Sequence, residues 1–491
     1  MIMNVLTLVL ISLTTVTSVS GQIFHNLDFR QLCDSSETGL CYWDLSWGGV
    51  GSVKPEDLDK KRCLQIYGKN ETTVGFAEQT VLAYKQNSLT IITVSASIKS
   101  DSISGKGAGL NIGLYNKNGL LIANKDMGGF YSLDWIKGTN EWKNYSISVV
   151  CPMETEKIKI GAILYGKGTA YFSDYNVVIN SIENRKPSKL ALQYIESACD
   201  TIKLNSLVRD SINIQQVKET ALKIAGNAKN YSDCHLAIDF LLESLRPFGD
   251  VHSFFMKADE VDNWENEGSQ VSKIVFPSYK IIDSCGYITV PPFHGGNQSL
   301  ILAYADSMQQ AIRMCYTSGI KGWIIDLRQN TGGNMEPMIA GLGPLFSSDK
   351  LGSLIDVNGN RESWFYKDGR YYADDYNGWT VSKPFEPSSS LPVAVLTSRQ
   401  TGSSGEIVAI SLIGNACTKS FGQPTWGLTT GNGSYELMDG SQIFLASTVM
   451  ADRNGKEYTT SITPDYLIED DPSTEDDEII DGALKWILKT K

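Results

Sequence analysis

The chain has 491 residues, a length that accommodates two or three domains. Its formal net charge of −12 argues against nucleic acid and against an anionic membrane surface as partners. The nine cysteines are scattered without a Cys-x-x-Cys pair, and no His-Glu-x-x-His occurs. We therefore predict neither a bound metal nor another cofactor.

The chain begins with a short apolar segment. Met1–Asn4 precedes the apolar run Val5–Leu13, which is followed by small residues as far as Gly21. This order is typical of a secretory signal peptide, and we expect residues 1–21 to be removed on export to the periplasm or the exterior. Because no other run of about twenty apolar residues appears, we do not expect an integral membrane protein.

Residues 22–183 show short runs in which apolar and polar side chains alternate, separated by Gly, Asn and Asp. Leu89–Ile98 and Lys157–Tyr165 are two examples. This period of two predicts an all-β sandwich domain. The ends of the region, Asn26–Phe29 and Gly166–Asp174, resemble the ends of galactose-binding-like jelly rolls. A carbohydrate is thus one candidate ligand, although Trp and Tyr residues in such domains are more often part of the core.

The rest of the chain has a different pattern. Pro187 and Ser188 precede apolar residues at helical spacing, which predicts a helical region over residues 187–250. From Gly286–Val290 onwards, strand-like and helix-like segments alternate. This alternation predicts an α/β core over residues 251–491.

A strand-like run, Leu391–Leu396, leads into a turn of small residues at Thr401–Ser404 and then into a helix-like pattern. Such a turn presents a hydroxyl group at a helix N-terminus, where free N–H groups can stabilise an oxyanion. Many hydrolases present a serine nucleophile in this way. Ser403-x-x-Glu406 is also a helix capping box, and taken alone this segment slightly favours capping.

A second buried-type strand, Gly322–Leu327, leads into a loop that contains Gly332 and Gly333. A helix-like segment follows from Met335. Paired glycines at a strand-to-helix junction let backbone amides approach a ligand and form an anion-binding nest. An ordinary tight turn is an equally good interpretation of this loop alone.

Taken together, Asp-Leu-Arg-x-Asn-x-Gly-Gly at 326–333 and Thr-x-Ser-Ser-Gly-Glu at 401–406 resemble the tail-specific, or C-terminal processing, peptidases. Both motifs occur in the family's order, and the resemblance extends from the predicted helical region to the end of the chain. It implies a ClpP/crotonase-like fold for the core. It also implies that Ser403 is the nucleophile and that amides at Gly333 and Ser404 form the oxyanion hole.

The chain departs from the commonest pattern of that family at the general base. Serine–lysine members carry a lysine after a Gly-x-Pro-Thr-x-Gly segment. Here the segment is 422–427, and the next residue is Leu428, which cannot accept a proton. We therefore do not expect a serine–lysine dyad.

A histidine offers another base. The segment 250–253, Asp-Val-His-Ser, resembles the Asp-x-His-Ser/Thr element of relatives that use a serine–histidine–acid arrangement, as the tricorn core does. An imidazole with a pKa near neutrality can take and return a proton, so His252 is the predicted base. His294 is the rival. His25 lies outside the catalytic region, and His235 lies within a helix pattern.

The orienting acid is open. Family members with a triad place a glutamate shortly before a Pro-Asp pair, and Glu457 occupies that neighbourhood, one residue out of the expected spacing. Asp452 is the alternative. Both carboxylates could equally be solvated turn residues.

These features predict a secreted serine endopeptidase that forms an acyl-enzyme on Ser403. An inactive peptide-, lipid- or carbohydrate-binding protein on the same fold is the alternative, and export disfavours an acyl-CoA enzyme. About thirty residues separate His252 from Gly286, too few for an inserted PDZ domain. We expect Gly352–Pro387 to form a loop that covers the substrate groove.

Overall fold

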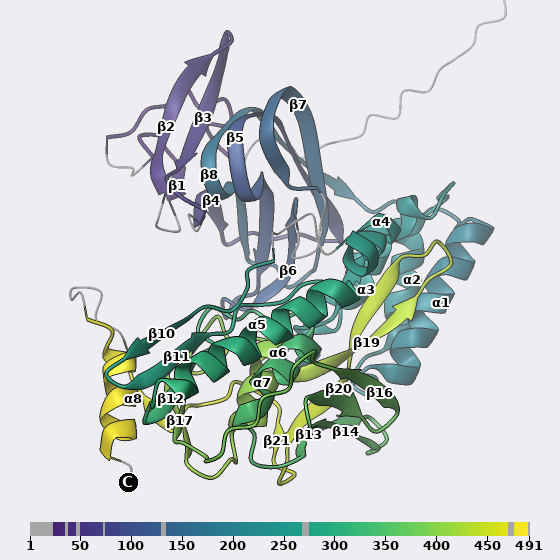
Figure 1. Cartoon of the computed structure of the whole chain (residues 1–491). Coiled ribbons are helices and arrows are strands. Elements are labelled where there is room, and N and C mark those ends of the chain that lie inside the picture. Colours follow the sequence, from purple (N-terminus) through teal and green to yellow (C-terminus); the bar gives the residue numbers. More distant parts are fainter. Residues whose placement is uncertain are drawn as a thin grey trace, which may run out of the picture. The chain divides into compact units, whose positions relative to one another are not determined.

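Figure 1 shows a computed structural model of the chain, in which these residues are described: 23–34, 38–45, 50–71, 74–128, 134–267, 274–469 and 476–489. The signal peptide predicted at 1–21 lies outside the described residues. The chain divides into two compact units, the first made of Met1–Met127 and Trp135–Glu183, and the second of Gly128–Asp134 and Asn184–Lys491.

The first unit is β-rich, and its strands pair antiparallel in one eight-stranded sheet within the described residues. The strands are β1 (Asp44–Leu45), β2 (Val50–Leu58), β3 (Lys61–Gly68), β4 (Val74–Leu82), β5 (Thr90–Tyr115), β6 (Leu121–Asp126), β7 (Ile136–Cys151) and β8 (Lys157–Ser181). Strands β5 and β8, of 26 and 25 residues, pair along most of their length. Shifts of register along this pair mark bulges, which let such long strands bend.

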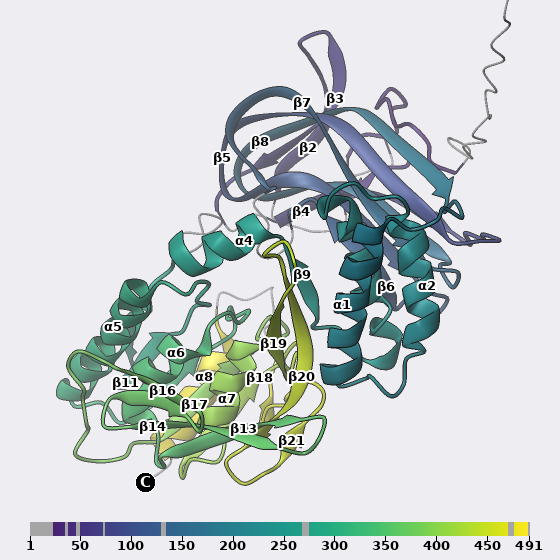
Figure 2. The ribbon, with the colours of Figure 1, turned by 90° about the vertical axis from the view of Figure 1, so that its right-hand side faces the viewer.

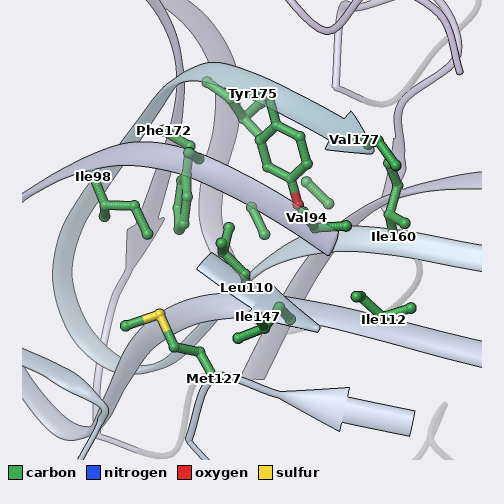
Figure 3. Close-up of a cluster of buried hydrophobic side chains, with 14 of the residues drawn as sticks. Val94, Ile98, Leu110, Ile112, Met127, Ile147, Ile160, Phe172, Tyr175 and Val177 are labelled. Atoms are coloured by element: carbon green, nitrogen blue, oxygen red, sulfur yellow. The ribbon is translucent and has the colours of Figure 1, made fainter. Parts of the chain in front are cut away.

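The core of this unit follows from the alternation seen in the sequence. Val94 and Leu110 on β5 are fully buried, as are Ile160 and Phe172 on β8, and their side chains converge in Figure 3. Because successive residues of a strand point to opposite faces, this burial requires every second residue to be apolar. The β-rich N-terminal region is thus confirmed, whereas the jelly-roll topology stays a prediction.

The second unit begins with three helices, α1 (Lys189–Asn205), α2 (Ile214–Ala225) and α3 (His235–Glu243). The side chains of Ser188 and Asn213 accept hydrogen bonds from the first turns of α1 and α2, which fixes where these helices begin. Among the described residues, no helix is long and apolar enough to cross a membrane.

A six-stranded sheet forms the centre of the second unit, in the order β10-β11-β12-β17-β18-β22. Its strands are β10 (Tyr279–Ile282), β11 (Cys285–Thr289), β12 (Gly322–Asp326), β17 (Val393–Thr397), β18 (Thr418–Gly422) and β22 (Tyr466–Leu467). All neighbours pair in parallel except β10 and β11.

Helices cover both faces of this sheet (Figure 1). They are α5 (Gln298–Thr317), α6 (Met335–Leu342) and α7 (Ser404–Leu412) on one face and α8 (Glu478–Lys489) on the other. The buried strand residues divide accordingly, since Ile325 packs with the first group and Ile324 with α8. Burial on both faces explains why these strands are continuously apolar in the sequence.

A second, antiparallel sheet runs β16-β15-β14-β13-β20-β19, with β9 and β21 also paired to β20. Its strands are β9 (Phe254–Met256), β13 (Lys350–Asp356), β14 (Arg361–Lys367), β15 (Arg370–Ala373), β16 (Tyr376–Thr380), β19 (Thr430–Glu436), β20 (Gln442–Asp452) and β21 (Glu457–Tyr458). Figure 2 shows β19 and β20 extending together towards α1, and Leu437 and Leu445 pack in the core of the helical region.

The expectation that Gly352–Pro387 forms a covering loop is wrong. Most of this segment lies in β13 to β16, which pair as successive hairpins. Aromatic side chains stabilise the pairing, as in the stacked rings of Phe365 and Tyr372, whose centroids are 4.9 Å apart. The Gly, Asp and Tyr residues that suggested a loop are distributed between these strands and their turns.

The charged residues of the Asp-Leu-Arg motif hold the sheet to α8. Arg328 forms ion pairs with Asp326 and with Asp477, each at 2.8 Å. The hydroxyl group of Tyr287 donates to Asp326 at 2.5 Å. Asp477 also caps the start of α8 through the Ile480 amide. This part of the motif therefore stabilises the fold at the end of β12.

Candidate active site

The two glycine- and serine-containing loops meet at the carboxyl ends of the neighbouring parallel strands β12 and β17. The Gly402 amide donates to the backbone oxygen of Asn330 at 3.0 Å, and the Thr401 hydroxyl donates to that of Leu327 at 2.8 Å. Loops that follow adjacent parallel strands converge at one edge of a sheet, where α/β proteins commonly bind ligands.

Asn330 is the side chain that holds this edge together. It is fully buried, and its amide group donates to the Val290 oxygen at 2.9 Å while its carbonyl group accepts from the Gly332 amide at 3.0 Å. Its backbone oxygen accepts from the serine loop, as described above. One residue thus fixes the end of β11, the glycine loop and the serine turn relative to one another.

Ser403 adopts an unusual backbone conformation at the start of α7. Its φ is 50° and its ψ is −119°, a region that a residue with a side chain rarely occupies and that costs about 1–3 kcal/mol. Its amide donates to the carboxylate of Glu406 at 2.9 Å, so the glutamate half of the capping box is formed. The Glu406 amide donates to the backbone oxygen of Ser403 at 2.8 Å.

The glycine loop packs directly against this turn. Gly332 and Gly333 have φ values of +108° and +106°. A Cβ atom on Gly332 would lie 2.8 Å from the Cβ of Ser403 and 3.1 Å from the Ser404 nitrogen, and one on Gly333 would lie 2.0 Å from the backbone oxygen of Phe293. Only glycine fits at either position, for steric as well as conformational reasons.

Two backbone amides at this contact have no acceptor among the described residues. The amides of Gly332, Asn334 and Gly405 all donate to oxygen atoms of the chain. The amides of Gly333 and Ser404, which alternate with them, donate to none within the described part of the structure. Such amides at a helix N-terminus can receive a negatively charged oxygen.

His252 is partly buried and is hydrogen-bonded through its ring to Thr430, the first residue of β19. Its Nδ1 lies 2.8 Å from the hydroxyl oxygen of Thr430, and its backbone oxygen accepts from the Asn432 side chain at 3.0 Å. Burial lowers the pKa of His252 to about 4. The imidazole is therefore neutral at physiological pH, the state a general base requires.

The segment that precedes β19 connects His252 with the serine turn. The Trp426 amide donates to the Thr401 oxygen at 2.8 Å, and Leu428 reaches within 3.6 Å of the position a Cβ on Gly402 would take. Thr430, the partner of His252, follows two residues later. Leu428 thus lies beside the serine turn, and the residues before Ser403 and the ring of His252 contact opposite ends of one short segment.

The other histidines are distributed as follows. The Nδ1 of His294 lies 2.9 Å from the position of a Cβ on Gly333, so the rival base lies against the glycine loop. His235 bonds to Asp439 at 3.2 Å in the helical region, and His25 belongs to the first unit. Within the second unit, the rival base therefore lies against the glycine loop, and the predicted base is linked to the serine turn through the segment that ends at Thr430.

Neither candidate acid is hydrogen-bonded to His252. The carboxylate of Glu457 is half exposed and pairs with Arg361 at 3.2 Å. Asp452 is buried and accepts from the Asn454 amide at 2.8 Å and from other groups of its own turn. Among the described residues, the hydrogen-bond partner of the His252 ring is the Thr430 hydroxyl.

Sequence reasoning missed two residues of this site. Asn330 is part of the Asp-Leu-Arg-x-Asn-x-Gly-Gly motif, but the sequence does not indicate its structural role. Nothing near Thr430 in the sequence indicates a contact with a histidine 178 residues earlier. Among the described residues, no three His, Cys, Asp or Glu side chains are grouped as metal ligands.

The site combines a strained serine at a strand-to-helix turn, two backbone amides without an acceptor among the described residues, and a neutral, partly buried histidine. This combination is typical of serine-type peptidases, a class of hydrolases. Comparison with protein families matches residues 284–468 to Peptidase family S41. The chain therefore carries a domain of this serine peptidase family, and it belongs to the hydrolases.

Two known proteins are similar to the chain in sequence. A nisin-resistance protein of Lactococcus lactis subsp. lactis is 27% identical over 296 residues, which cover 60% of this chain and 86% of that protein. Carboxyl-terminal-processing peptidase 2, chloroplastic, of Arabidopsis thaliana is 27% identical over 206 residues. These cover 41% of this chain and 35% of the plant protein.

Two solved structures are also similar. A lipoprotein from Streptococcus agalactiae matches with 25% identity and a TM-score of 0.48, over 61% of this chain and 96% of the other. The photosystem II D1 C-terminal processing protease matches with 14% identity and a TM-score of 0.41, over 60% and 97% of the two chains.

The contact between the glycine loop and the serine turn can be tested with Gly332→Ala. The new methyl group would displace Ser403 or the Ser404 amide, so we expect the rate at which a fluorophosphonate probe labels Ser403 to fall about 100-fold. Gly455→Ala is the matched control, because Gly455 has a φ of +88° and open space around it. Equal labelling rates in the two variants would show that the contact is unimportant.

Proposed function

We propose that the chain is an exported serine endopeptidase that cleaves peptide bonds through an acyl-enzyme on Ser403. The observation that carries this proposal is the arrangement of the strained serine turn beside the backbone amides of Gly333 and Ser404, which have no acceptor among the described residues. A serine hydroxyl beside unpaired N–H groups is suited to attack a carbonyl whose oxygen becomes negatively charged.

In the proposed mechanism, neutral His252 takes the proton of Ser403 as the serine oxygen attacks the peptide carbonyl. The amides of Gly333 and Ser404 donate to the resulting oxyanion. The imidazolium returns its proton to the leaving amine, which departs and leaves the acyl-enzyme. His252 then takes a proton from water, and the hydroxide equivalent releases the acid product and restores the serine.

Thr430 takes the orienting position in this mechanism. A hydrogen bond from Nδ1–H of His252 to the Thr430 hydroxyl leaves Nε2 with its lone pair free to accept the serine proton. A neutral hydroxyl stabilises an imidazolium less than a carboxylate does. We leave Glu457 and Asp452 out of the mechanism, because their carboxylates bond to other groups.

The proposed substrates are proteins or peptides, and the proposed location is the cell envelope or the exterior. One similar protein is named a carboxyl-terminal-processing peptidase and the other a nisin-resistance protein, and both names are compatible with peptide substrates. The apolar N-terminal sequence at residues 1–21 supports export. A carbohydrate ligand of the first unit remains a prediction from sequence.

The assignment of nucleophile and base can be tested with three alanine variants. A fluorophosphonate probe should label the wild type, and Ser403→Ala should lose the label entirely. His252→Ala should label and cleave an unfolded protein substrate at least about 1,000-fold more slowly. His294→Ala should keep most of the activity. Full labelling of Ser403→Ala would refute the assignment of the nucleophile, and an unlabelled wild type would favour a binding protein. Loss of activity in His294→Ala alone would move the base.

The pH profile tests the state of His252. Its lowered pKa means that the neutral, proton-accepting form predominates above a pH of about 4. We therefore expect kcat/KM to rise with pH around a midpoint near 4 and to be level by about pH 6. Stability at each pH is checked by returning samples to pH 7 before assay. A midpoint near 6.5, the ordinary histidine value, would contradict the assignment.

A further inference from the structure

We propose that Glu406 is a positioning residue that clamps the nucleophile turn to the segment bearing Trp426, Leu428 and Thr430, and thereby sets the distance between Ser403 and His252. The inference rests on the proposed function, because it assigns a role within that site. It goes beyond the capping box, which concerns only the start of α7.

The two carboxylate oxygens of Glu406 bond to different parts of the site. Oε2 accepts from the Ser403 amide at 2.9 Å. Oε1 accepts from the Thr425 hydroxyl at 2.5 Å and from the Gly427 amide at 3.0 Å. The side chain is fully buried beneath the turn. One rigid planar group thus joins the backbone of the nucleophile to the start of the adjacent segment.

That adjacent segment leads to the base. Gly427 is followed by Leu428, which lies beside Gly402, and then by Thr430, whose hydroxyl bonds to the His252 ring. Only Leu428 and Thr429 therefore separate Gly427, whose amide bonds to Glu406, from Thr430, whose hydroxyl bonds to the base. A shift of the segment relative to the turn would move His252 away from Ser403.

The chemistry of the clamp requires two accepting oxygens. Both backbone amides, those of Ser403 and Gly427, can only donate, and they meet different oxygens of the same carboxyl group. A glutamine of the same shape has one oxygen and one NH₂ group. Whichever way it is turned, its NH₂ group faces a backbone N–H, and that N–H is left buried without an acceptor.

Protonation of Glu406 does not break the clamp in the same way. Burial raises the pKa of Glu406 to about 7, so the acid and the carboxylate are both present near neutrality. A protonated Oε1 can donate to the Thr425 hydroxyl oxygen and still accept from the Gly427 amide, while Oε2 continues to accept from Ser403. Replacement by glutamine therefore tests the clamp more sharply than a change of pH does.

Glu406→Gln separates this proposal from capping alone, because a capping box accepts glutamate and glutamine equally. We expect kcat to fall about 100-fold and KM to change less than about threefold, since a displacement of about 1 Å between reacting groups has an effect of this size. Fluorophosphonate labelling of Ser403 should slow in parallel. Circular dichroism and Tm establish that the variant is folded.

Glu260→Gln is the matched control. Glu260 is also a buried carboxylate that accepts from the backbone amide at the start of a helix, that of Lys257, at 2.8 Å. The same chemical change there should leave kcat and KM at wild-type values. A wild-type kcat in Glu406→Gln, with Ser403→Ala inactive, would overturn the clamp and leave the proposed function intact. Activity in Ser403→Ala would instead refute the proposed function.

Should Glu406→Gln not fold, Thr425→Val decides the question. This variant removes one of the two donors to Oε1, together with the acceptor of the Ile462 amide, and leaves the bond to the Ser403 amide in place. We expect kcat to fall about tenfold at unchanged KM, because the Glu406 carboxylate loses one of its hydrogen bonds. A wild-type kcat in folded Thr425→Val would overturn the proposal.

Discussion

The site depends on one close contact, in which the backbone of a glycine loop packs against the turn that carries Ser403. The approach is so close that a methyl group at Gly332 would lie 2.8 Å from the serine Cβ. The side chain of Asn330, in the loop that follows β12, fixes the glycine loop, and the side chain of Glu406 fixes the serine turn. The positive φ of Ser403 is maintained by these surroundings, because an isolated chain would not adopt it.

Much of this arrangement could be predicted because it is encoded locally. A run of buried-type residues followed by Gly-Gly, and another followed by small residues and Ser403, indicate strands that end in functional loops. Parallel pairing of β12 and β17 then brings the loops together, although about seventy residues separate them. The β-rich first unit was visible for the same reason, since its strands alternate in burial with a period of two.

The remainder depends on contacts that leave no local pattern. Thr430 meets His252 only because β19 lies beside the segment after Gly249, and the sequence instead directed attention to the carboxylates of Glu457 and Asp452. Glu406 was visible as a capping residue, but its bonds to Thr425 and Gly427 belong to tertiary structure. Turn-forming residues within the hairpins β13 to β16 suggested a loop, because hairpin turns and loops share a composition.

The most direct measurement is a crystal structure of the protein inactivated with a peptidyl phosphonate. The account predicts phosphorus bonded to the Oγ of Ser403, with the phosphonyl oxygen accepting hydrogen bonds from the amides of Gly333 and Ser404. It also predicts that Nε2 of His252 faces the Ser403 oxygen, while Nδ1 keeps its hydrogen bond to the Thr430 hydroxyl. An adduct whose oxygen points away from both amides, or that is contacted by His294 in place of His252, would contradict the account.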